Sequence, residues 1–176
     1  MNRLNLLSFI PFIYFLFAFA NHSPQNYRTY TPRDSSYTIS YPQTWEAHRG
    51  RRSFQLMLIS PRTDSTDKFQ ENVIIFREDM EGKKLDGYVN YLIKEKLPKS
   101  VKGFSLISKK KEKINNLNSF VLEYKFEYRA PVKSLAYVFE KDGFSYVVLG
   151  TAPDSTFSKY KQIFTNVGHS FIFNKK

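Results

Sequence analysis

The stretch SSYTISYPQTWEAH, residues 35–48, decides the fold. Apolar and hydroxyl side chains alternate along it, as they do in a strand with one buried face, and the apolar residues are Tyr37, Ile39 and Tyr41. Pro42 ends the ladder because it has no N–H to donate. A lone tryptophan, Trp45, follows three residues later. The stretch predicts a strand that closes in an aromatic-proline-tryptophan corner.

The N-terminus predicts export. Arg3 precedes an apolar run over residues 4–20 that ends in Ala18-Phe19-Ala20, which is the pattern of a secretory signal peptide cleaved after Ala20. The alternative is a membrane anchor, but 17 residues are short for a spanning helix of about 20. No cysteine follows, so a lipid-anchored form is excluded. The remaining chain reads as a flexible lead-in over residues 21–35 and a single domain over residues 36–174.

The charge balance points to an anionic partner. The chain has 27 basic and 16 acidic side chains, and removal of Arg3 with residues 1–20 leaves a formal charge of +10 (26 minus 16). Such a charge suits an acidic protein, anionic lipids or acidic glycans. Export argues against nucleic acid as the partner. The absence of cysteine also excludes thiol catalysis and cysteine-ligated metals.

The periodicity of the remaining chain predicts an α+β fold with an antiparallel sheet. Asp142-Gly143 lies between two apolar runs and is a strong hairpin signal. Helical spacing of apolar residues predicts one helix over 85–97, stopped by Pro98, and another from Phe157 to Val167, capped by Asp154 or Ser155. Besides the first strand, the predicted strands are 54–60, 72–76, 104–108, 120–128, 134–140 and 144–151, and residues 171–173 fold back onto the sheet.

The corner formed by Tyr41, Pro42 and Trp45, together with this order of elements, resembles the PsbP-like superfamily, which includes the extrinsic PsbP subunit of photosystem II and DcrB-type bacterial envelope proteins. The resemblance implies an antiparallel sheet of about six to seven strands, covered by helices on both faces as an α/β/α sandwich. It also implies that the indole packs against the sheet. Members are mostly non-enzymatic binding or accessory proteins, so the resemblance implies no cofactor and no catalytic residues.

Sites for chemistry are few in the sequence. The three histidines, His22, His48 and His169, have no second ligand at metal-binding spacing. A turn rich in carboxylates at residues 78–81 has no EF-hand pattern and reads as a solvated acidic turn. No nucleophile or phosphate-binding motif is present. We therefore expect no metal, no cofactor and no enzyme; a hydrolase would need a cleft that brings His48 or His169 to a carboxylate.

Two basic clusters are the candidate docking residues. Both fall in predicted connections, and their members are Arg49, Arg51 and Arg52, and Lys109, Lys110, Lys111 and Lys113. If they share a face, they form a patch for an acidic protein or an anionic membrane or glycan surface; otherwise they only keep the loops soluble. A different function is a carrier that holds a small apolar ligand between the sheet and the helix at 85–97. The aromatic stripe at 120–128 would then line a pocket instead of a closed core.

Overall fold

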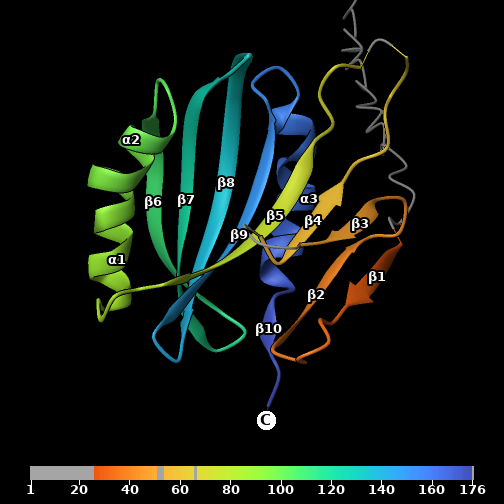
Figure 1. Cartoon of the computed structure of the whole chain (residues 1–176). Helices are drawn as coiled ribbons and strands as arrows, with labels where there is room; N and C mark the ends of the chain where they lie inside the picture. Colours follow the sequence, from red (N-terminus) through yellow and green to blue (C-terminus); the bar gives the residue numbers. More distant parts are fainter. Residues whose placement is uncertain (1–25, 51–53, 66, 176) are drawn as a thin grey trace, which may run out of the picture.

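The computed structural model describes residues 26–50, 54–65 and 67–175 and shows an α+β fold (Figure 1). The strands and helices, in chain order, are β1 (Tyr27–Tyr30), β2 (Tyr37–Pro42), β3 (Glu46–Arg49), β4 (Leu56–Ile59), β5 (Asn72–Asp79), α1 (Leu85–Tyr91), the π-helix η1 (Leu92–Lys96), α2 (Leu97–Ser100), β6 (Ser105–Ile114), β7 (Leu117–Tyr128), β8 (Ala130–Lys141), β9 (Phe144–Pro153), α3 (Phe157–His169) and β10 (Ile172–Phe173).

Seven strands form one antiparallel sheet in the order β3-β4-β5-β9-β8-β7-β6. A tight hairpin joins β8 to β9, and Lys141 pairs with Phe144 across it. Asp142 and Gly143 have φ angles of 53° and 79° at this turn, which is the left-handed region that asparagine, aspartate and glycine adopt most easily. The predicted hairpin and the predicted antiparallel sheet of about six to seven strands are confirmed.

The two faces of this sheet pack against different layers. Along β8, Leu135, Tyr137 and Phe139 belong to a cluster that contains α3, whereas Ala136 and Val138 contact the cluster under α1. Side chains alternate across a strand, so the helices lie on opposite faces, with α1 to α2 at one side of Figure 1 and α3 behind the sheet. The predicted coverage by helices matches only loosely, because a second, three-stranded sheet shares the α3 face.

The corner after β2 carries the chain from the small sheet into the large one. β2 lies between β1 and β10 in the small sheet, whereas β3 is the first strand of the large sheet. At the corner the Trp45 N–H donates to the Pro42 carbonyl at 2.9 Å, and Arg28 from β1 donates to the Trp45 carbonyl at 2.7 Å. Pairing with the small sheet thus ends just after Pro42, where Gln43 donates its N–H to the Asn26 carbonyl at 2.8 Å, and the chain then turns into β3.

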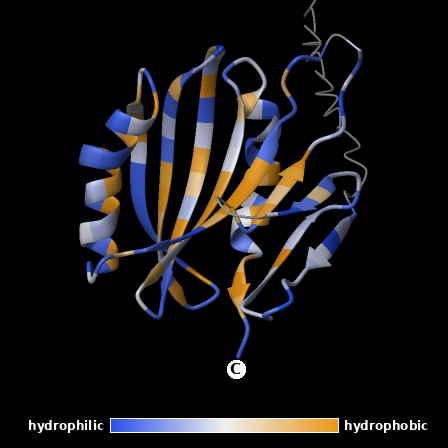
Figure 2. Ribbon diagram, in the orientation of Figure 1, coloured by the Kyte–Doolittle hydropathy of each residue, from blue (hydrophilic) through white to orange (hydrophobic). Residues whose placement is uncertain are grey.

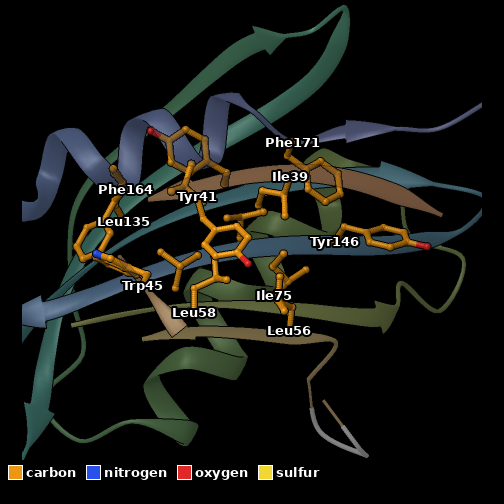
Figure 3. Packing of buried hydrophobic residues seen from close by; sticks show 14 of the residues in the cluster. Ile39, Tyr41, Trp45, Leu56, Leu58, Ile75, Leu135, Tyr146, Phe164 and Phe171 are labelled. Atoms are coloured by element: carbon orange, nitrogen blue, oxygen red, sulfur yellow. The ribbon is translucent and has the colours of Figure 1, made fainter. Parts of the chain in front are cut away.

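Half of the buried residues in the core on the α3 face are aromatic (Figure 3). The Trp45 indole is 2% exposed and lies 6.3 Å from the ring of Tyr160 and 6.4 Å from that of Phe164, both in α3. Leu135 of β8 belongs to the same cluster. The indole therefore packs in the layer between α3 and the large sheet.

Three predicted boundaries are wrong for a common physical reason. Residues 27–30, within the predicted lead-in, form β1; residues 46–49 form β3; and β6 extends through the lysines to Ile114. Most side chains of β1 and β3 are exposed or half-buried, and β6 is an outermost strand. Strands that bury little apolar surface give no alternating hydrophobic signal. Arg49 and the lysines consequently lie on strands instead of connections.

The helix over the other face continues past its predicted stop and contains a π-helical segment. Leu97 donates its N–H to the carbonyl of Leu92, five residues earlier, and α2 then runs to Ser100. Pro98 has no N–H, and its ring crowds the carbonyl four residues before it, so a regular α-helix would be strained here. The wider π turn relieves this crowding and allows the helix to continue.

Candidate functional site

The structure places Arg49 and the predicted lysine cluster at opposite edges of the large sheet. Arg49 is exposed at the end of β3, and the lysines lie on β6. These two strands are the opposite edges of the seven-stranded sheet, six strand spacings apart, which corresponds to roughly 29 Å at about 4.8 Å per spacing. Arg51 and Arg52 lie outside the described residues. Arg49 and the lysines therefore do not form one patch.

The lysines of β6 differ in their surroundings. Lys109 donates to the Asn90 side chain at 2.8 Å, and Lys111 pairs with Asp86 at 3.3 Å, so both connect the edge strand to α1. Both ammonium groups also lie over the Phe120 ring, at 5.3 and 5.6 Å from its centre. Lys110 and Lys113 are exposed, and no polar contact holds either of them within the described part of the chain. These two carry the free positive charge of the edge.

Exposed apolar residues continue the same edge. Leu106 is 37% exposed and Ile107 is 46% exposed. The pairing of β6 with β7 shifts between Leu106 and Ser108, so Ile107 lies in a bulge without a partner on β7. Bulges and lysines both discourage pairing of an edge strand with another chain. We call the six residues Leu106, Ile107, Lys109, Lys110, Lys111 and Lys113 the basic edge.

A cavity of about 290 Å³ lies between the π-helical segment and the sheet. Leu92 and Leu97 line it from the helix, and apolar side chains of four strands line it from below. Figure 2 shows hydrophobic stretches on β5 and β8. The residues contributed by the sheet are Phe76, Leu122, Tyr124, Phe126, Ala136, Val138, Val147 and Leu149. Part of the aromatic stripe therefore lines a cavity, and Phe120 is core.

A charged cluster borders this cavity. Glu78, on β5, accepts a hydrogen bond from the Tyr88 hydroxyl at 2.6 Å and pairs with the Lys96 ammonium at 2.5 Å. Burial raises the pKa of Glu78, but the hydrogen bonds from Lys96 and Tyr88 outweigh it and leave this pKa below its ordinary value. Burial and the contact with Glu78 both raise the pKa of Tyr88. The rim therefore carries an ionised carboxylate, an ammonium and a neutral phenol.

In the variant Glu78→Gln, the free energy of unfolding is expected to depend less on pH under acidic conditions than in wild type. A lowered pKa means that Glu78 adds stability above its unfolded value of about 4.3, and this stability is lost as the pH falls through the folded value. The unfolding free energy of wild type should therefore fall more steeply than that of the variant below about pH 4.3. Urea titrations between pH 3 and 7 measure this. The control is Glu140→Gln, at an exposed residue; equal slopes for wild type and Glu78→Gln would contradict the assignment.

The histidines do not assemble a catalytic or metal site among the described residues. His48 is exposed on β3 and lies 3.2 Å from Glu46, two residues away. His169 ends α3, pairs with Glu112 of β6 at 3.1 Å and contacts the Tyr137 ring. The described residues contain no group of three metal-ligating side chains. Each histidine thus has one carboxylate beside it. His169 also lines a surface pocket with Ser40 and Ser170, but the Ser170 hydroxyl donates to the backbone carbonyls of Ser40 and Val167, and among the described residues no hydrogen bond joins it to His169.

Carboxylates of the predicted acidic turn also have partners. β5 extends to Asp79, so Glu78 and Asp79 lie on a strand. Asp79 accepts the N–H of Glu81 at 2.7 Å, and Glu81 pairs with Lys83 at 2.8 Å. The charged cluster at the cavity was missed by sequence reasoning because its members are far apart in the chain. Only the helical spacing of Tyr88 and Lys96, two turns apart, hinted that they share a side.

The described residues include no helix that is long and apolar enough to span a membrane. The predicted signal peptide, with cleavage after Ala20, lies outside the described residues, and so does His22.

Three solved structures share the fold. The cyanobacterial PsbP of Synechocystis matches at 14% identity and a TM-score of 0.63, covering 90% of this chain and 99% of its own. The Ran-binding protein Mog1p of Saccharomyces cerevisiae matches at 10% identity and 0.61, covering 84% and 95%. LpqN, involved in cell envelope biogenesis of Mycobacterium tuberculosis, matches at 12% identity and 0.55, covering 88% of each chain. At such identities the likeness shows the fold alone.

Sequence comparison gives the family. No curated protein sequence matches the chain. The family model described as PsbP, however, matches residues 25–173, which includes the corner at Pro42 and Trp45 and every strand and helix of the described domain. The chain therefore belongs to the PsbP family.

Proposed function

We propose that this protein is an exported, non-catalytic accessory protein that docks to an anionic membrane surface through the basic edge. The observation that carries the proposal is the composition of β6: four lysines follow two exposed apolar residues on one outermost strand. Lysines near an anionic surface each contribute about 1 kcal/mol of attraction. The apolar pair adds burial in the headgroup region.

The combination of charge and apolar exposure favours lipid over an acidic protein. Lys110 and Lys113 are exposed, and Leu106 and Ile107, near the start of the same strand, are exposed as well. Peripheral membrane proteins use this pairing of basic and apolar side chains. The excess of basic over acidic side chains adds a long-range attraction to any anionic surface. Arg49, at the opposite edge of the sheet, is not part of this surface.

Export and the absence of catalysis are supported by separate observations. Residues 1–20 have the composition of a signal peptide, and one structural relative is described by its role in the cell envelope. The described residues contain no cluster of metal ligands, and among them no hydrogen bond joins His48 or His169 to a serine hydroxyl: His48 contacts Glu46, and His169 contacts Glu112. The chemistry of the described surface is therefore that of a binding protein.

Reversal of the two free lysines is expected to release the protein from membranes. Lys110→Glu with Lys113→Glu removes about 2 kcal/mol of attraction, which weakens binding to vesicles by about 30-fold or more at low salt. Cosedimentation with vesicles of phosphatidylglycerol and phosphatidylcholine measures this. The melting temperature should stay close to that of wild type, because both side chains are exposed.

The matched control is Arg49→Glu with Lys159→Glu, which changes the net charge by the same four units away from the basic edge. It should bind vesicles nearly as well as wild type. Equal weakening of both double variants would show that only net charge matters, and stronger weakening by the control would move the docking surface to β3. Binding to an acidic protein but not to anionic vesicles would overturn the membrane assignment.

A further inference from the structure

We propose that the cavity under the π-helical segment binds the hydrocarbon part of an anionic, single-chain amphiphile, with its head group at Lys96. This site is on the face of the sheet that carries α1, and neither Lys110 nor Lys113, the two free lysines of the basic edge, lines it. The cavity, the break in helical hydrogen bonding above it and the charged rim are three separate observations that meet at this place.

The size and lining of the cavity define the apolar part. Its volume of about 290 Å³ is roughly twice that of the ~150 Å³ apolar cavity known to bind benzene, which leaves room for about a dozen carbon atoms. Phe76, Phe126, Val147 and Leu149 line it and are only partly buried. They form an apolar floor that the helix leaves half uncovered, and a hydrocarbon chain lying on it would complete their burial.

The helix above the cavity is locally widened at the residues that line it. Leu92 and Lys96 are the first and last residues of the π-helical segment, and both reach the cavity. Such segments are uncommon and occur frequently at functional sites. Pro98 maintains the widened turn, as described above. Lys109 and Lys111 tie the helix to β6 through Asn90 and Asp86, so the helix stays over the cavity without filling it.

The rim favours an oxyanion as head group. The Lys96 ammonium has three N–H donors, of which one goes to Glu78, and the exposed hydroxyl of Ser100 lies on the same rim. Glu78 is paired with Lys96 and also accepts a hydrogen bond from the Tyr88 hydroxyl, so it does not need all three donors of the ammonium. A carboxylate or phosphate can therefore take the remaining donors of Lys96. An uncharged head group would gain less, because hydrogen bonds between charged partners are about twice as strong.

The test compares dodecanoate, dodecyl phosphate and dodecanol as probes by isothermal titration calorimetry, each below its micelle concentration. Val147→Phe fills the cavity from β9 and should weaken binding of all three at least tenfold. Lys96→Met keeps the aliphatic stem but removes the charge. It should weaken the two anions about tenfold and leave dodecanol nearly unchanged. Stronger binding of dodecanoate than of dodecyl phosphate identifies a fatty-acid ligand, and the reverse order identifies a phosphate-headed lipid.

Two controls isolate the site. Ile163→Phe adds similar bulk at a partly buried residue on the other face of the sheet, and Lys99→Met removes an exposed charge paired with Glu95; both should bind like wild type. Val147→Phe should melt no lower than wild type, and Leu149→Phe replaces it if it fails to fold. Absence of dodecanoate and dodecyl phosphate binding by wild type, or undiminished binding by the filled variant, overturns the proposal.

This outcome is separable from that of the docking experiment. Lys110→Glu with Lys113→Glu should bind dodecanoate like wild type, since neither residue lines the cavity. Val147→Phe should in turn bind vesicles like wild type. Loss of both activities in either variant would indicate general misfolding instead of two sites.

Discussion

Trp45→Ala is expected to destabilise the domain by about 3–5 kcal/mol, the range measured when a buried large aromatic is truncated. The indole is 2% exposed and packs on Tyr160 and Phe164 of α3, so its removal leaves a cavity between the helix and the sheet. Domains of this size have a total stability of about 5–15 kcal/mol. The variant should therefore lose a large share of its stability, and its melting temperature should fall by about 6–20 °C.

The measurement is urea unfolding followed by far-ultraviolet circular dichroism, because Trp45 is the only tryptophan of the chain and its fluorescence disappears with the substitution. Trp45→Phe retains a ring against α3 and should lose less than half as much. Tyr128→Ala truncates an aromatic that is 56% exposed and should change stability by less than about 1 kcal/mol. A loss of only that size for Trp45→Ala would show that the corner is not essential to the core.

Gly150→Val is expected to cost about 3 kcal/mol or more, at the upper end of the range for overpacked cores. Gly150 lies on β9 between Val73 of β5 and Leu135 of β8. A Cβ atom at this residue would lie 2.4 Å from Cγ of Phe164, a side chain that is 1% exposed. The added valine must therefore push α3 away from the sheet. The displaced helix should leave part of the core between α3 and β9 exposed to solvent.

A double-mutant cycle isolates this clash. Phe164→Ala alone should cost about 3–5 kcal/mol, but Gly150→Val should cost much less on that background because the clashing ring is gone. The control is Gly87→Val, which places the same side chain where no other atom lies within 4 Å. Strict additivity of the two substitutions would contradict the close approach of α3 to β9. Equilibrium unfolding in urea gives all four free energies.

The sequence predicts the parts of the fold that bury apolar side chains. The alternation in Phe120, Leu122 and Tyr124 marks β7, and Asp142-Gly143 marks the hairpin, because each pattern has a local physical cause. β1 and β3 are held by backbone pairing with a neighbour that does bury its side chains. The positions of β1 and β3 therefore depend on contacts with other strands. The order of apolar and polar residues within β1 or β3 alone does not reveal these contacts.

The candidate sites divide in the same way. The sequence predicts the lysine cluster from its run of charges. It also predicts, as a second possible function, a ligand site between the sheet and the helix at 85–97. Their spatial relation is not visible, since Arg49 and the lysines lie at opposite edges of a sheet whose strand order is not sequential. The pair between Glu78 and Lys96 joins residues 18 positions apart and depends on the π turn, which no periodic pattern announces.

The position of β2 between β1 and β10 has a consequence for the timing of folding. Thr38 pairs with Ile172, 134 residues later (172 minus 38), and Phe171, which is fully buried, stacks on Phe139 and Tyr37 just before β10. A chain emerging N-terminus first has neither contact until residues 171–173 have been synthesised. Contacts of such long sequence separation form late and slowly. The small sheet and the aromatic stack beneath it are therefore completed only after residues 171–173 have reached β2.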